Sequence, residues 1–128
     1  MNPPVQQAIG ELKATFDPCA VVVEDDGQGG AFVIIESVPL NRPYDQKETW
    51  FGFHITGQFP YSDIYPVFVR ADLRRADNKA LGDGISPGHT FRTRGAVQVS
   101  RKSSGRDPMI ETASAKILKV RAFLESRP

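Results

Sequence analysis

The sequence contains few residues that could cross-link the chain or ligate a metal. One cysteine, Cys19, and two histidines, His54 and His89, are present among 128 residues. A single thiol rules out an internal disulfide and a zinc site made of several cysteines. We therefore expect neither a structural metal nor a cofactor.

Long apolar runs are missing as well. No stretch approaches the roughly 18 apolar residues that a membrane-spanning helix needs. The first residues, MNPPVQQAIGEL, lack the charged and then apolar order of a secretory signal peptide. These features predict a cytoplasmic protein without a membrane partner.

Neither sign of charge dominates the chain. Sixteen Lys and Arg residues against 15 Asp and Glu residues leave a net charge of +1, so the broad positive field of a general nucleic-acid binder is absent. The composition, with 40% hydrophobic and 24% charged residues, is that of an ordinary globular protein. The length fits a single domain over residues 1–128.

The first half of the chain predicts an α+β fold that begins with a helix. Apolar residues recur at helical spacing over residues 4–16, and Asn2 is positioned to cap this helix. Asp17-Pro18 ends it, because the residue before a proline disfavours the α conformation. The segments that follow predict a four-stranded antiparallel meander over residues 19–24, 31–38, 48–59 and 67–73.

The second half is less regular. Residues 74–94 are rich in Gly, Asp, Asn and charge and predict a long irregular loop, which in a small domain is usually functional or mobile. A short strand-like segment at 96–100 leads into a basic, hydroxyl-rich loop at 101–106. Asp107 and Pro108 suit the start of a C-terminal helix. Its expected buried stripe consists of Ile110, Ala113, Ile117, Val120, Phe123 and Leu124.

Two segments carry a resemblance to a known family. FPYSDIYPVFV, residues 59–69, is similar to the aromatic, Tyr-Pro and strand signature of the ubiquitin-conjugating enzyme (UBC-like) superfamily. PGHTFRTRGAVQV, residues 87–99, is similar to the family's histidine loop and its approach to the catalytic cysteine. With Asp107-Pro108 before the last helix, the chain resembles the family along nearly its whole length. The resemblance implies a UBC-like fold in which residues 74–94 form the irregular active-site loop.

The chain also departs from the family pattern. Aligning Gly95 and Pro108 with the family's glycine and later proline places Gln98 where the catalytic cysteine belongs, and Cys19 is expected at the start of the first strand, too far away to replace it. The family's His-Pro-Asn appears here as Gly88-His89-Thr90. The chain therefore resembles a divergent bacterial member, of the kind encoded beside a ubiquitin-like protein and an activating enzyme in antiphage defence operons.

A serine is the leading candidate for the missing nucleophile. Strand alternation turns Val97 and Val99 inward and Gln98 and Ser100 outward, so a strand two residues longer than usual places Ser100 where the family has its cysteine. We hypothesise that Ser100 carries the C-terminal glycine of a ubiquitin-like protein as an oxyester, with His89 as its base. The other candidates are Thr90 and Gln98 as oxyanion donors and Ser103 and Ser104 as rival nucleophiles.

Basic residues flank this candidate site. They are expected to hold the acidic face or tail of a protein partner, and they lack the interleaved aromatic residues of a single-strand nucleic-acid binder. The resemblance implies two partners, a ubiquitin-like protein and a ubiquitin-activating-type enzyme. The candidate partner-binding residues are Arg92, Arg94, Arg101, Lys102 and Arg106.

Plainer interpretations exist for each of these residues. A serine or a cation in a polar loop is most often simply solvated, His54 is best explained as structural, and Cys19 as a small buried thiol. A second functional hypothesis is a catalytically inactive UBC-like module that binds a ubiquitin-like protein or an activating enzyme. A third is a small α+β adaptor unrelated to ubiquitin chemistry.

Overall fold

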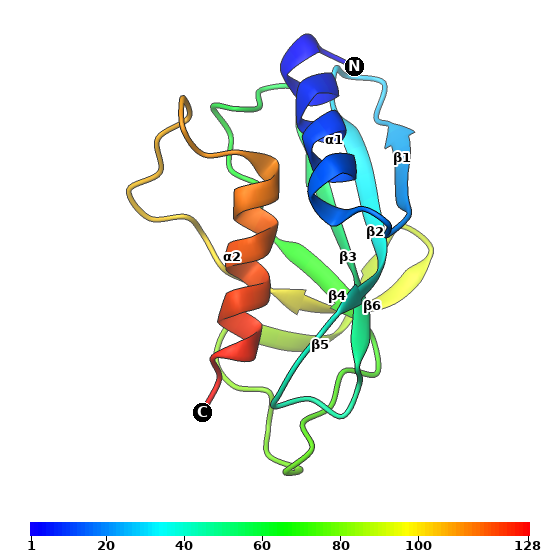
Figure 1. Cartoon of the computed structure of the whole chain (residues 1–128), viewed down its shortest axis with the longest axis vertical. Helices are drawn as coiled ribbons and strands as arrows, with labels where there is room; N and C mark the ends of the chain where they lie inside the picture. The colour runs from blue at the N-terminus through cyan, green and yellow to red at the C-terminus, as the bar shows by residue number, and fades with distance from the viewer.

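Six antiparallel strands form one sheet, and two helices lie against one of its faces (Figure 1). The computed structural model describes residues 1–128. The strands follow the order β1-β2-β3-β4-β6-β5 across the sheet. The elements are α1 (Pro3–Phe16), β1 (Val21–Asp25), β2 (Ala31–Pro39), β3 (Glu48–Ile55), β4 (Val67–Arg70), β5 (Ile85–Phe91), β6 (Arg94–Val99) and α2 (Ala113–Glu125).

The N-terminal helix agrees with the sequence prediction. α1 ends at Phe16, directly before Asp17-Pro18, and its apolar stripe faces the sheet. The expected side-chain cap is wrong. Asn2 occupies the capping position, but its side-chain amide donates to the carbonyl of Gly57 at 3.0 Å. Asn2 therefore ties the start of α1 to the turn after β3, and its backbone carbonyl alone accepts bonds from the first helical N–H groups.

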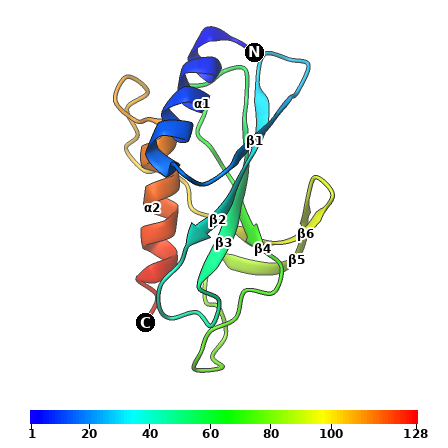
Figure 2. The ribbon, with the colours of Figure 1, turned by 45° about the vertical axis from the view of Figure 1, so that its right-hand side comes forward.

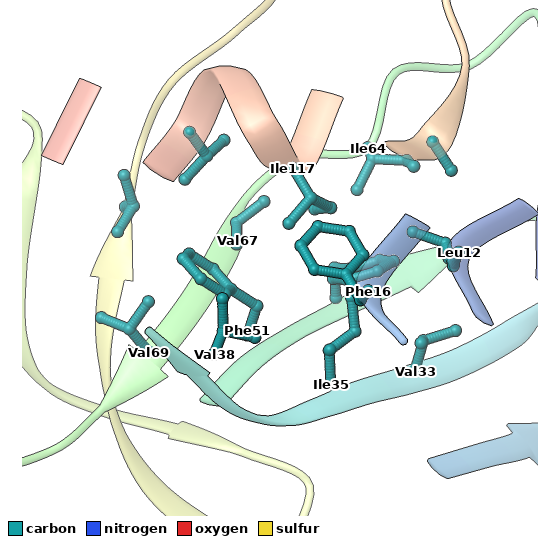
Figure 3. Packing of buried hydrophobic residues seen from close by; sticks show 14 of the residues in the cluster. Leu12, Phe16, Val33, Ile35, Val38, Phe51, Ile64, Val67, Val69 and Ile117 are labelled. Atoms are coloured by element: carbon teal, nitrogen blue, oxygen red, sulfur yellow. The ribbon is translucent and has the colours of Figure 1, made fainter. Parts of the chain in front are cut away.

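The face of the sheet that meets the helices, called the inner face, carries the hydrophobic core. Phe51, Phe53 and Ile55 of β3 are fully buried at alternate positions, as the predicted alternation of this strand requires. Figure 3 shows residues of α1, α2 and the strands interdigitating in this layer. Twenty-six buried residues belong to the one cluster, so both helices and the whole sheet share a core.

The sheet has six strands rather than the four expected. β1 to β4 follow one another as the predicted meander, although β3 and β4 end earlier than the sequence suggested, at Ile55 and Arg70. The predicted loop over 74–94 contains β5, which pairs with β6 through a tight turn at residues 92–93. The sequence did not predict β5, because Pro87 and Gly88 within it both disfavour regular strand pairing. A bulge between Ser86 and His89 absorbs them.

The C-terminal helix begins later than predicted. Asp107 accepts bonds from Met109, Ile110 and Glu111 in an isolated turn, and α2 starts only at Ala113. Thr112 is the true cap, since its hydroxyl oxygen accepts from the N–H of Ala115 at 3.0 Å. Ile110, expected in the buried stripe, is instead 76% exposed.

The remaining predicted stripe of α2 matches the structure. Ala113, Ile117, Val120 and Leu124 are fully buried at helical spacing, and Phe123 is half-buried at the edge of the stripe.

Neither α1 nor α2 combines the length and the apolar character that crossing a membrane requires.

Candidate functional site

Ser100 follows directly after β6, at the position that the sequence assigned to the nucleophile. It is half-buried, and its backbone N–H donates to the carbonyl of Gly84 at 2.7 Å. The side-chain amide of Gln98 donates to the Ser100 hydroxyl oxygen at 3.1 Å. The two residues project from the same face of the strand, as alternation predicted. Gln98 therefore donates a hydrogen bond to the Ser100 hydroxyl. To activate a serine as a nucleophile, a neighbouring base must instead accept the hydroxyl proton.

His89 lies elsewhere on the hairpin. Its Cα is opposite that of Ala96, four residues before Ser100 along β6, a separation of about 13 Å at normal strand rise. Its ring Nε2 lies 3.2 Å from the hydroxyl of Ser86. Thr90 occupies the next position on β5, so its side chain points to the opposite face from His89. The structure brings neither His89 nor Thr90 to Ser100.

Ser86 is the hydroxyl that the sequence reasoning missed. It lies on β5 opposite Gln98 and is exposed, with His89 as its hydrogen-bond partner across the bulge. A neutral histidine in this position can take a serine proton. The sequence shows only a Ser-x-x-His spacing. That spacing brings the two side chains together only because a bulge separates Ser86 from His89.

Ser103 and Ser104 lie in the loop after β6 and line a pocket together with Lys116 of α2. The ammonium of Lys116 in α2 donates to the Ser103 hydroxyl at 2.9 Å, to the carbonyl of Arg101 at 2.6 Å and to the Asp63 carboxylate at 3.2 Å. The Asp63 carboxylate also accepts from the N–H of Ser103 at 2.9 Å. Ser104 is exposed.

This network anchors a loop. The Lys116 side chain is only 3% exposed, and its three N–H donors are matched by three acceptors. Burial alone would raise the pKa of Asp63, but the hydrogen bonds from Ser103 and Lys116 outweigh it and leave that pKa below its ordinary value. A charged, fully satisfied lysine has no lone pair to accept a proton, so it positions Ser103 without activating it.

The five candidate cations do not form one patch. Arg92 and Arg94 lie at the tip of the β5–β6 hairpin, which reaches over the face of the sheet opposite the helices, called the outer face (Figure 2). Arg92 forms an ion pair with Glu24 of β1. Arg94 forms two hydrogen bonds, at 2.9 and 2.5 Å, with Glu36 of β2. The bonds from Arg94 hold the pKa of Glu36 below its usual range.

The other three cations belong to the loop after β6. Arg101 stacks on the Phe123 ring at 5.1 Å, and the Lys102 ammonium lies 5.2 Å from the Tyr65 ring centre. Arg106 donates to backbone carbonyls of the segment after β3 and contacts Asp63 at 3.7 Å. Arg106 therefore has a structural role, and the predicted shared partner surface is divided between two places.

Aromatic side chains line the outer face beneath the hairpin tip. Phe91 is 5% exposed and lies directly over Gly52, where an added Cβ atom would come within 2.6 Å of its ring. Its ring also stacks on Phe68, with centroids 5.1 Å apart. Above this layer, Arg92 covers Phe32 at 3.9 Å and Arg94 covers Trp50 at 5.1 Å. The hairpin is thus held down by packing, stacking and ion pairs together.

A groove remains between the hairpin tip and β1–β2. Its volume is about 440 Å³. Apolar side chains form part of its lining, and charged residues complete it. The lining residues are Val22, Glu24, Phe32, Ile34, Arg92, Thr93 and Arg94. We call this the outer-face groove. It combines exposed apolar area with two cations, which are the elements of a protein-binding surface.

The remaining histidine and the cysteine have structural surroundings. His54 bonds to the Asp26 carboxylate at 2.7 Å and stacks on Phe32 with ring centres 4.3 Å apart. The bond from His54, with further bonds from Gln28 and Gly30, keeps the pKa of Asp26 below its ordinary value. Cys19 is half-buried and lies two residues ahead of β1 rather than at its start.

No group of three or more His, Cys, Asp or Glu side chains is gathered where it could hold a metal ion.

No protein-family model matches this chain, and no curated protein or solved structure matches it either. The UBC-like relationship therefore stays a prediction from the sequence.

Proposed function

We propose that the protein is a UBC-like module that binds a ubiquitin-like protein without carrying it covalently. The observation that supports this choice is the environment of Ser100, whose hydroxyl accepts a bond from Gln98 and has no contact with His89. Without a base, a serine is a weak nucleophile at neutral pH. Binding does not need an activated hydroxyl, so it fits this site better than transfer does.

The outer-face groove supports docking of a protein. Val22 is 51% exposed, and Phe32 and Ile34 beside it are only half-buried. The guanidinium groups of Arg92 and Arg94 each offer five N–H donors and use only one or two of them on their glutamate partners. A partner with an apolar patch beside carboxylates would complement this surface, because the patch would cover the apolar lining and the carboxylates would pair with the two arginines.

The test is a calorimetric titration with a ubiquitin-like protein from the source genome. Ile34→Asp removes apolar contact area from the floor of the outer-face groove and adds a carboxylate that competes with the partner for Arg92 and Arg94, so it should weaken binding at least about tenfold. Ile110→Asp makes the same chemical change at an exposed position outside the groove. This control should bind as the wild type does.

Two results would count against the proposal. If wild-type protein shows no heat of binding to any ubiquitin-like protein of the genome, the partner class is wrong. If Ile34→Asp and Ile110→Asp bind equally well, the partner uses another surface.

A second candidate function rests on the Ser86–His89 contact of 3.2 Å. In this alternative, the Ser86 hydroxyl oxygen attacks the thioester carbonyl that joins the ubiquitin-like protein to its activating enzyme. His89 accepts the serine proton, a C–O bond replaces the C–S bond, and the enzyme's thiolate leaves and is protonated. Ser86→Ala would abolish such an adduct, whereas Ser100→Ala would leave it.

A further inference from the structure

The two edges of the sheet differ in how well they are protected. β5 contains Pro87, which has no backbone N–H, and a bulge between Ser86 and His89. β1, at the other edge, contains neither proline nor lysine and pairs with β2 without a register shift. It lies at the margin of the molecule in Figure 1. Natural sheets usually block an exposed edge, because its unpaired backbone groups attract another strand. The only charges on β1 are Glu24 and Asp25, and each is paired with a cation of its own chain.

The ladder between β1 and β2 shows which backbone groups are already used. The N–H of Glu36 donates to the carbonyl of Ala20 at 2.9 Å, and the N–H of Asp26 donates to the carbonyl of Gly30 at 3.2 Å. Hydrogen-bonded pairs alternate along antiparallel strands. The residues of β1 that bond to β2 are therefore the even-numbered ones between these two ends.

The odd-numbered residues direct their backbone N–H and C=O groups away from the sheet. These residues are Val21, Val23 and Asp25. They provide three donors and three acceptors in a row, which is the pattern that a further antiparallel strand requires. The central one is Val23, so the row is symmetric about this residue.

We propose that β1 pairs with β1 of a second copy of the chain, antiparallel and centred on Val23. In this register Val22 lies opposite the partner's Glu24, and Val21 lies opposite the partner's Asp25. No carboxylate faces another carboxylate, and each already has a cation of its own chain, Arg92 for Glu24 and the Met1 ammonium for Asp25. Like charges directly opposite would destabilise the pair, so this sequence is compatible with self-pairing in that register.

The pairing has a geometric consequence for the outer face. Antiparallel pairing of identical residues places a twofold axis through the new ladder. The outer-face grooves of both copies then open on the same side of one continuous sheet, with Val22 of each copy near the junction. A partner with two binding sites could engage both grooves, which raises its avidity without any new contact.

Charge substitutions at Val22 test the register. Val22 is 51% exposed, so the fold tolerates either charge. Val22→Glu faces the partner's Glu24 twice in each dimer and should raise the dissociation constant roughly tenfold. Val22→Lys also adds a charge to the edge, but it faces opposite charges, so its dissociation constant should stay well below that of Val22→Glu. Sedimentation equilibrium of the full chain, from micromolar to millimolar concentration, measures both.

A backbone substitution tests the edge itself. Val23→Pro removes an outward N–H that the monomer does not use and leaves the β1–β2 ladder intact, so it should abolish the dimer. Val23 also packs against the core, so some loss of monomer stability is expected in both Val23 variants. Val23→Thr keeps both the N–H and the β-branched shape, and it should dimerise as the wild type does. Circular dichroism should give the wild-type spectrum for both variants, which checks that they are folded.

Three outcomes would overturn the inference. The wild type stays monomeric throughout the concentration range. The dimer persists in folded Val23→Pro, which means that it uses another surface. Val22→Glu and Val22→Lys change the dissociation constant equally, which means that these residues do not face the partner's Glu24.

Discussion

The two faces of the sheet are covered by different means. On the inner face, two helices seal a layer of side chains that have no contact with solvent, among them Phe51, Phe53 and Ile117. On the outer face, the chain's own β5–β6 hairpin folds over half-buried aromatic rings, held by Arg92 and Arg94. Burial of the inner face supplies the stability of the fold. The outer face is held partly by ion pairs, which salt and pH can weaken, and it leaves a groove open.

The largest effect is expected on the inner face. Phe51→Ala removes a fully buried ring of β3 from the core cluster that the strands share with both helices. It should lower the free energy of unfolding by about 3–5 kcal/mol, because the lost apolar contacts leave a cavity that packed neighbours cannot fill. Urea denaturation followed by circular dichroism measures this loss. A loss of less than about 1 kcal/mol would mean that the core is not packed as described.

On the outer face, Gly52→Ala should have a smaller and more local effect. The added methyl group would overlap Phe91 and Trp50 at distances below 3 Å, and such overpacking costs about 1–3 kcal/mol. We expect amide exchange to accelerate in β5 and β6 while β2 stays protected.

Gly10→Ala is the matched control for Gly52→Ala. Nothing lies within 4 Å of the added methyl group in α1. Alanine favours helix over glycine, so this variant should gain up to about 1 kcal/mol. If exchange accelerates evenly over the whole sheet in Gly52→Ala, the outer layer is not a separate unit.

The ion pair between Arg94 and Glu36 should contribute less. Both side chains are about one-third exposed, and exposed pairs contribute about 0.2–1 kcal/mol. Glu36→Gln should lose this amount at low salt and nothing at high salt, because ions screen the pair. Asp83→Asn, at an exposed carboxylate that forms no ion pair, is the control and should show no such salt dependence. Equal behaviour of the two variants would contradict a role for Glu36.

The smallest predicted effect is a pH dependence at Asp26. Its pKa in the folded protein lies below the ordinary value of about 3.9, because His54 and two backbone N–H groups bond to the carboxylate. The stabilisation is therefore present above that ordinary value and is lost as the pH falls through the folded pKa. Asp26→Asn should flatten the dependence of unfolding free energy on pH in this acidic range. Asp83→Asn, at an exposed position, should leave the dependence unchanged.

Local periodicity explains which elements the sequence could predict. The stripe of α1 and the alternation of β3 are repeated signals whose buried sides the structure confirms. β5 carries no such signal, because Ser86, Pro87 and Gly88 are held in a strand only by pairing with β6. The start of α2 was misplaced because Asp107-Pro108 has the composition of a helix start, while Thr112 provides the cap.

The same distinction holds at the candidate site. The shared face of Gln98 and Ser100 follows from strand alternation and was predicted correctly. The partner of His89 depends on a bulge, so the sequence could not show that it would be Ser86. The burial of Lys116 beside Asp63 depends on contacts 53 residues apart in the chain, and no local pattern indicates it.

Intact-mass spectrometry tests most directly whether the protein binds or carries its proposed partner. The protein is mixed with ATP, a ubiquitin-like protein of the same genome and its activating enzyme. We predict an unchanged mass under denaturing conditions and a non-covalent complex under native conditions. An adduct that resists thiol reductant and yields to alkaline hydroxylamine would contradict this account, because it would show that a hydroxyl of this chain carries the partner.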